Sequence, residues 1–138
     1  MAIKYAVAPG TVLICDYRQF KPPEMTKERP AIVVSPRLPH RDGLCAVVPL
    51  SQSPNNRPAA WDVRVELSEP TPPPYPGKVF WAKCDMLFTA GFHRLRFFKG
   101  ERDQYGKRKY VVPKVDDETL FRIRKGVMAA IGGLDFKG

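Results

Sequence analysis

The chain has 138 residues, 43% of them hydrophobic and 11% aromatic, and its 23 Lys/Arg against 14 Asp/Glu give a formal net charge of +9. This length and composition predict one domain, residues 1–138, with a hydrophobic core of its own; they exclude a disordered tail, and no apolar run approaches the roughly 20 residues of a membrane span. The basic charge favours a polyanionic partner, either nucleic acid or an acidic protein. Binding to an anionic membrane surface is also conceivable, but only the charge favours it.

The first half of the chain is predicted to be β-structure. Segments rich in Val, Ile and aromatic residues, each bounded by turn residues, predict strands at 11–17, 31–35, 44–50 and 61–67. In the last of these, apolar and charged residues alternate, which indicates an antiparallel strand with one face in solvent.

The Pro-rich segment 68–77 is predicted to be a stiff surface loop, because proline lacks the N–H that a central strand donates. A polyproline ligand for another domain is the alternative. Strands are predicted again at 78–84, 94–98 and 107–113, the last reached through an exposed basic hairpin at about 99–110.

In the last segment, after residue 116, the spacing of apolar residues changes from that of a strand to that of a helix. Apolar residues recur at spacings of three and four, which predicts one apolar helix face made of Leu120, Ile123, Val127, Ile131 and Leu134. Asp116 is the predicted N-cap, and Gly132 with Gly133 marks the end. Short strands followed by one closing helix predict a mainly β, α+β fold built as a small barrel-like antiparallel sheet.

Positive charge is concentrated toward the C-terminus, where residues 93–138 carry 12 Lys/Arg and 6 Asp/Glu. Basic residues and aromatic rings interleave there, which suits single-stranded nucleic acid, because charges follow phosphates and rings stack on bases. Strands with rings inward and charges outward would give the same pattern. The residues expected to contact RNA are Arg94, Arg96, Lys107, Arg108 and Lys109.

No disulfide, metal site or cofactor is predicted. Cys15, Cys45 and Cys84 are odd in number and far apart, no Cys-x-x-Cys occurs, and only two histidines, His40 and His93, are present. Isolated cysteines in apolar runs usually pack as small hydrophobic residues. Because the N-terminus also lacks the apolar stretch of a signal peptide, we expect a reduced, cytoplasmic protein.

Four stretches together resemble the PemK/MazF/Kid family of toxins from bacterial toxin–antitoxin pairs: PGTVLICDY, ERPAIVVSP, CAVVPLSQS and AKCDMLFT. The second resembles the family's Arg-Pro strand and the third its Val-Pro-x-Ser/Thr strand. Their order and spacing fit over about residues 9–98, and the helix after residue 116 fits the closing helix. The resemblance implies an SH3-like barrel, a homodimer and a cognate acidic antitoxin. It also implies ribosome-independent, metal-independent cleavage of single-stranded RNA to 2′,3′-cyclic phosphate and 5′-hydroxyl ends.

The resemblance also implies roles for five residues. Arg29 matches the active-site arginine, whose forked guanidinium suits phosphate oxygens, and Ser51 matches a Ser/Thr that contacts the scissile phosphate. Asp85 matches an aspartate proposed as the base in the Kid branch, and Lys83 stands where that branch has an arginine. Glu24 matches a glutamate that could orient the arginine or share the base role.

Each of these residues also has a purely structural explanation. Arg29 could cap the strand at the surface and pair with Glu24 or Glu28, Ser51 could close a turn, and Lys83 and Asp85 could form a surface ion pair. Alternation along one strand predicts that Lys83 and Asp85 share a face. Where the Kid branch has a histidine, this chain has Pro23, so the route of the proton is open.

Two other functions are kept beside the ribonuclease. The CcdB toxins, which poison DNA gyrase, share this barrel, so fold alone does not decide the activity. Their action would need an exposed apolar end of the closing helix, for which Leu134 and Phe136 are candidates. The third hypothesis is an RNA-binding module on the same fold that has lost the chemistry.

Overall fold

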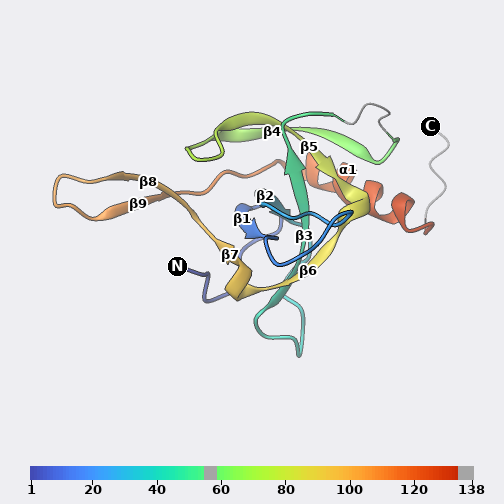
Figure 1. The fold of residues 1–138 in the computed structure, drawn as a ribbon, viewed down its shortest axis with the longest axis horizontal. Coiled ribbons are helices and arrows are strands. Elements are labelled where there is room, and N and C mark those ends of the chain that lie inside the picture. Colours follow the sequence, from blue (N-terminus) through green and yellow to red (C-terminus); the bar gives the residue numbers. More distant parts are fainter. Residues whose placement is uncertain (55–58, 134–138) are drawn as a thin grey trace.

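The molecule is an antiparallel β-structure closed by one helix, as Figure 1 shows for residues 1–54 and 59–133, which the computed structural model describes. The strands are β1 (Val12–Asp16), β2 (Glu28–Val33), β3 (Leu44–Ser51), β4 (Asp62–Thr71), β5 (Gly77–Lys83), β6 (Phe88–Gly91), β7 (Leu95–Arg96), β8 (Phe98–Arg102) and β9 (Arg108–Val111). The short 3₁₀ helices are η1 (Cys84–Met86) and η2 (Phe92–Arg94), and the α-helix is α1 (Asp117–Ala130).

The main sheet runs in the order β4-β5-β3-β2-β1-β7, and every pairing in it is antiparallel. β3 is the strand that connects the β4–β5 pair to the rest of the sheet. Its first residues pair with β6, its middle residues with β2, and its last two with β5. The edge strands β4 and β7 do not pair with one another in the described residues, so the barrel-like sheet stays open. The predicted fold class is confirmed.

Both faces of the sheet carry a hydrophobic core. Even-numbered residues of β1 and β2 pack with β4, β5 and α1, and odd-numbered residues of the same strands form a second cluster that includes Tyr17, Cys45 and Leu95. The central strands are therefore buried on both sides and read as continuous apolar runs, whereas the edge strand β4 alternates.

Helix α1 begins as predicted, with the Asp116 carboxylate accepting from the Thr119 N–H at 2.8 Å. Gly126 allows the helix to lie against η1, since a Cβ there would stand 2.7 Å from the Cys84 sulfur. The predicted apolar face is wrong at its far end, because Ile131, the residue that follows the last turn of α1, is 71% exposed. Leu134 lies outside the described residues.

The prediction of a loop over all of 68–77 is also wrong in part, because β4 continues to Thr71. As an edge strand it tolerates a proline, and the register shifts between Glu66 and Thr71. The predicted basic hairpin is present as β8–β9 and projects from the body in Figure 1. Phe98 is buried at its root, and Tyr105 near its tip is 85% exposed. In the described residues no helix combines the length and the apolar character of a membrane span.

Candidate active site

Pairing of β2, β3 and β5 brings three of the predicted site residues onto one face of the sheet. Ala31 lies opposite Pro49, so Arg29 and Ser51, each two residues further toward the same end, return to one face. Ser51 lies opposite Trp81, and Lys83, two residues along β5, joins them.

Two of these residues carry buried donors that no described residue satisfies. Arg29 Nε and Lys83 Nζ are both inaccessible and have no hydrogen-bond partner in the described structure. Lys83 is only 5% exposed, and lysine is almost never buried to that degree without a partner. Because a buried cation is stabilised by an anion with hydrogen-bond acceptors, this face is suited to a phosphate group.

Tyr17 links this face to an apolar hollow beneath the chain between β1 and β2. Burial raises the pKa of the Tyr17 hydroxyl above its usual value, and the nearby Arg29 charge opposes that shift. The hollow has a volume of about 250 Å³; Tyr17, Phe20 and Met86 line it, and Glu24 also borders it.

Glu24 is placed differently from its predicted role. It is exposed, and its carboxylate accepts from the Lys21 backbone N–H at 3.3 Å, which closes the local turn. In the described residues it makes no hydrogen bond or ion pair with Arg29. Because Glu24 borders the hollow, its role as a general base stays a prediction.

The prediction that Lys83 and Asp85 share a strand face is wrong. β5 ends at Lys83, and the chain turns at once into η1, where Asp85 is exposed. The turn follows from packing, because the Cys84 thiol is buried and donates to the Ile123 carbonyl of α1 at 3.6 Å. Asp85 directly precedes Met86, which lines the apolar hollow, so its candidacy as base also remains a prediction.

Arg29 and Ser51 also border a second, more polar cavity of about 400 Å³, which the Pro-rich loop between β4 and β5 covers. The Ser51 hydroxyl donates to the Ser53 carbonyl at 3.2 Å and accepts from the Ser53 N–H at 3.3 Å. These two bonds form the turn that the sequence suggested as the structural explanation for Ser51. A hydroxyl with such long local bonds can still turn toward a ligand.

A cluster centred on Glu28 was not predicted from the sequence, where this residue was considered only as a partner of Arg29. The Glu28 carboxylate accepts from both terminal nitrogens of Arg96 and, at 2.9 Å, from the Tyr75 hydroxyl, with Arg18 at 3.5 Å. The Arg96 guanidinium holds the pKa of Glu28 below its usual range, so this carboxylate is a poor base. The sequence did contain one signal for this cluster: neighbouring residues of a strand point to opposite faces, so Glu28 points away from Arg29 and is free to bind other partners.

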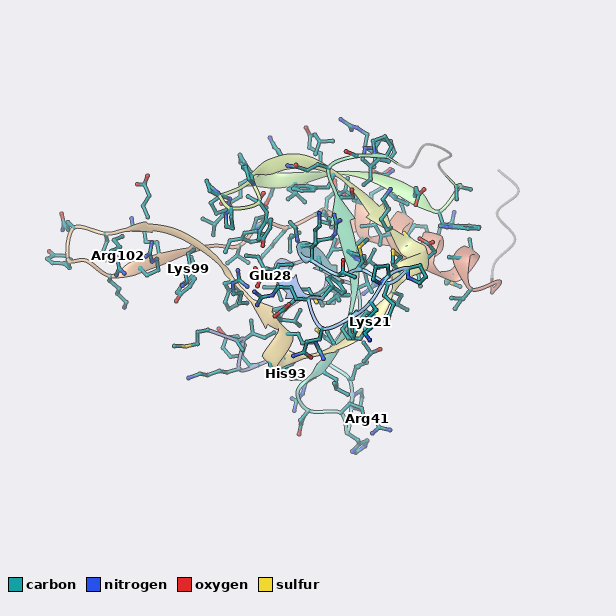
Figure 2. The ribbon with its side chains drawn as sticks, in the orientation of Figure 1. Lys21, Glu28, Arg41, His93, Lys99 and Arg102 are labelled. Atoms are coloured by element: carbon teal, nitrogen blue, oxygen red, sulfur yellow. The ribbon has the colours of Figure 1, made fainter. Side chains whose placement is uncertain are left out.

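The predicted RNA contacts divide into two groups. Arg96 is engaged by Glu28, and Arg94 lies 5.0 Å from the Phe20 ring centroid and donates to Gln19 at 3.0 Å, so both hold the fold together. The other three, Lys107, Arg108 and Lys109, lie on the β8–β9 hairpin, where Lys99 and Arg102 add further positive charge (Figure 2).

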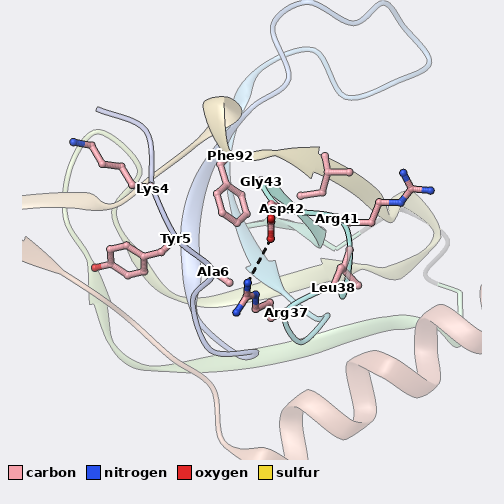
Figure 3. A pocket seen from close by; sticks show the side chains of 10 residues that line it. Lys4, Tyr5, Ala6, Arg37, Leu38, Arg41, Asp42, Gly43 and Phe92 are labelled. Atoms are coloured by element: carbon pink, nitrogen blue, oxygen red, sulfur yellow. Dashed lines mark hydrogen bonds and ion pairs between the residues drawn. The ribbon is translucent and has the colours of Figure 1, made fainter.

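A further hollow of about 430 Å³ lies at the opposite end of β2 and β3 (Figure 3). Its Arg37–Asp42 ion pair spans 3.5 Å between side chains that are 79% and 88% exposed, so it contributes little. Figure 3 shows Lys4 and Arg41 extending away from its centre. Among the described residues, no cluster of three or more His, Cys, Asp or Glu is placed to hold a metal ion.

A comparison with protein families finds one match over most of the chain. The family described as "PemK-like, MazF-like toxin of type II toxin-antitoxin system" matches residues 8–128. No curated protein is significantly similar in sequence.

Solved structures share the fold at low sequence identity. An endoribonuclease in complex with its cognate antitoxin from a mycobacterial species has a TM-score of 0.59 at 19% identity, over 92% of this chain and 96% of that chain. MazF (Form-I) from Deinococcus radiodurans has a TM-score of 0.58 at 14% identity, over 93% and 98%. MazE–MazF (Form-II) from the same organism has a TM-score of 0.52 at 14% identity, over 93% and 97%.

Proposed function

The chain belongs to the PemK-like, MazF-like toxins of type II toxin–antitoxin systems, and from this membership we propose that it is an endoribonuclease that cleaves single-stranded RNA. Solved structures of the same fold include proteins described as endoribonucleases, which supports the proposal. The single observation that carries it for this chain is a pair of buried cationic donors, Arg29 Nε and Lys83 Nζ, on the sheet face that also carries Ser51; neither donor has a hydrogen-bond partner among residues 1–54 and 59–133.

The proposed chemistry is attack of the RNA's own 2′-hydroxyl on the adjacent phosphorus. The bond from phosphorus to the 5′-oxygen breaks, leaving a 2′,3′-cyclic phosphate and a 5′-hydroxyl, and no metal is required. Arg29 and Lys83 would stabilise the charge that grows on the phosphoryl oxygens, and Ser51 would donate a hydrogen bond to them.

The 2′-hydroxyl must lose a proton to a base, and the leaving oxygen must gain one. Asp85 and Glu24 remain the proposed bases, because both are exposed carboxylates near the apolar hollow. Glu28 is unsuited, since Arg96 keeps its pKa low.

The β8–β9 hairpin is the proposed RNA track. It carries Lys99, Lys107 and Lys109 in exposed positions, together with the exposed ring of Tyr105. Charges that follow the phosphates and rings that stack on bases are the usual means of holding single strands without reading their sequence.

A cognate acidic antitoxin and a second copy of the chain are the proposed partners, and the cytoplasm is the proposed compartment. The mycobacterial endoribonuclease that shares this fold is described in complex with its cognate antitoxin. For this chain the support is its +9 charge, which complements an acidic polypeptide and would speed the encounter.

The decisive experiment incubates purified protein with a long single-stranded RNA in EDTA and maps the ends. Fragments with 2′,3′-cyclic phosphate and 5′-hydroxyl ends are expected. Intact RNA would overturn the proposal.

A gyrase poison is the second candidate, and one observation favours it. Helix α1 presents an apolar surface, with Phe121 62%, Met128 45% and Ile131 71% exposed. Leu134 and Phe136, the residues first considered for such contact, lie outside the described residues. Inhibited supercoiling alongside intact RNA would select this function.

A further inference from the structure

The Pro-rich loop between β4 and β5, residues 72–76, is tied to the rest of the molecule at several points. The Thr71 hydroxyl lies 2.6 Å from the Tyr75 carbonyl oxygen and 3.0 Å from that of Gly77. The Gln52 side-chain amide donates to the Pro76 carbonyl, and the Tyr75 hydroxyl donates to Glu28. The loop is therefore a fixed wall and needs no ordering when a ligand arrives.

Two details show how tightly this wall is built. A Cβ on Gly77 would stand 2.8 Å from Gln52 Nε2 and 2.9 Å from Phe80 Cζ, so any larger residue there would displace the Gln52 amide or the Phe80 ring. The ring of Tyr75 packs against the hydrophobic core while its hydroxyl is held by Glu28. Burial and the Glu28 charge both raise the pKa of Tyr75, so its hydroxyl stays protonated and keeps donating.

The cavity of about 400 Å³ beneath this loop combines flat apolar walls with polar groups at its mouth. Pro74, Tyr75 and Phe80 supply the walls, and Lys27 and Arg29 supply positive charge. The volume lies within the usual range for small-molecule sites, about 300 to 1,000 Å³. Flat rings beside cations suit a planar heteroaromatic group attached to a phosphate, which is a nucleotide.

The cavity also adjoins the proposed phosphate site, since Arg29 and Ser51 border both. The Gln52 amide reaches the same cavity, and amides of this kind read the hydrogen-bonding edges of bases. Glu28 does not repel a phosphate there, because Arg96 and Arg18 offset its charge.

We propose that this cavity is a nucleotide subsite, in which Tyr75 stacks on the base next to the scissile phosphate and Gln52 selects its identity. The inference rests on the proposed ribonuclease function and adds specificity-determining residues to it. Glu28 acts indirectly, as the residue that positions Tyr75.

The test maps the cleavage sites of a random-sequence RNA pool with the parent protein and with Tyr75→Leu, Gln52→Leu and Tyr5→Leu. Tyr5 is 67% exposed at the far hollow, so its variant is a matched control for losing a ring. Gln52 is exposed, so its variant keeps the body of the fold even if Tyr75→Leu does not, although it releases the hold of the amide on the Pro76 carbonyl.

We expect Tyr75→Leu to lower the cleavage rate by about 10- to 100-fold, the usual effect of losing one base–ring stack. Base preference should flatten at one position next to the cut. Gln52→Leu should alter preference at that same position, and Tyr5→Leu should change neither. Parent-like preferences in both Tyr75→Leu and Gln52→Leu would overturn the subsite while leaving the ribonuclease intact.

Binding of an uncleavable 2′-O-methyl oligonucleotide separates the two proposals. If the parent cuts no RNA but Tyr75→Leu binds this probe at least tenfold more weakly than Tyr5→Leu, the subsite stands and the ribonuclease fails. Equal binding by these two variants would reject the subsite as well.

Discussion

The Tyr75 hydroxyl donates to the Glu28 carboxylate at 2.9 Å, across 47 positions of sequence. This bond joins the Pro-rich loop to the start of β2, next to Arg29. Arg96 completes the junction from β7 by donating to both oxygens of the same carboxylate. One acidic side chain thus connects three segments that meet around the proposed site.

The first prediction concerns Arg29. Arg29→Ala should reduce RNA cleavage by about 10² to 10³, because it removes a preorganised charge at the phosphate. Arg29→Lys should also be slow, since a point charge does not replace a fork. Single-turnover rates measure this, with circular dichroism as a check on the fold. A variant as fast as the parent would remove Arg29 from the site.

The second prediction separates function from stability at Lys83. Lys83→Met keeps the length of the side chain and removes a buried charge whose Nζ has no hydrogen-bond partner among the described residues, so the free energy of unfolding should rise by about 1 to 3 kcal/mol. Cleavage should fall at the same time. Thermal melts and rates on the same preparation test both effects, and a destabilised variant would show that Lys83 has a structural partner in solution.

The third prediction concerns pH. Arg96 keeps the folded pKa of Glu28 below its ordinary value of 4.5, so ionised Glu28 contributes stability above that value. This contribution should be lost as pH falls below 4.5 and through the lowered folded pKa. Denaturant titrations of the parent and of Glu28→Gln should therefore converge on acidification. A constant gap between them would contradict the pairing.

The fourth prediction concerns the hairpin. Lys107→Gln with Lys109→Gln should weaken RNA binding and flatten its dependence on salt, by about 0.7 in log–log slope for each phosphate that the hairpin no longer neutralises. Lys4→Gln with Arg41→Gln removes the same charge at the far hollow and serves as the control. If both pairs change the slope equally, net charge alone and not the hairpin explains the binding.

The fifth prediction concerns partners. Light scattering should give about twice the mass of one chain, because one self-complementary patch would lengthen a short basic cleft. A short acidic peptide encoded beside the gene should displace RNA stoichiometrically, by placing carboxylates where phosphates bind. A monomer whose RNA binding ignores every such peptide would reject both partners.

The sequence by itself determined the elements whose signal is local. Alternation in β4, continuous apolar runs in β1 and β3, and the Asp116 cap of α1 each depend on neighbours a few residues away. The same local patterns carried the family resemblance. They also placed Arg29 and Ser51 at the ends of two predicted strands.

Only the tertiary structure decided which charges are free to act. Arg94 and Arg96 look like RNA contacts in the sequence, yet partners 75 and 68 positions away, respectively, engage them. Lys83 looks like half of a surface ion pair, yet the packing of α1 on Cys84 ends β5 there and separates it from Asp85. The physical reason is that a strand's period states which face a residue takes, whereas the register and packing of distant segments decide what lies on that face.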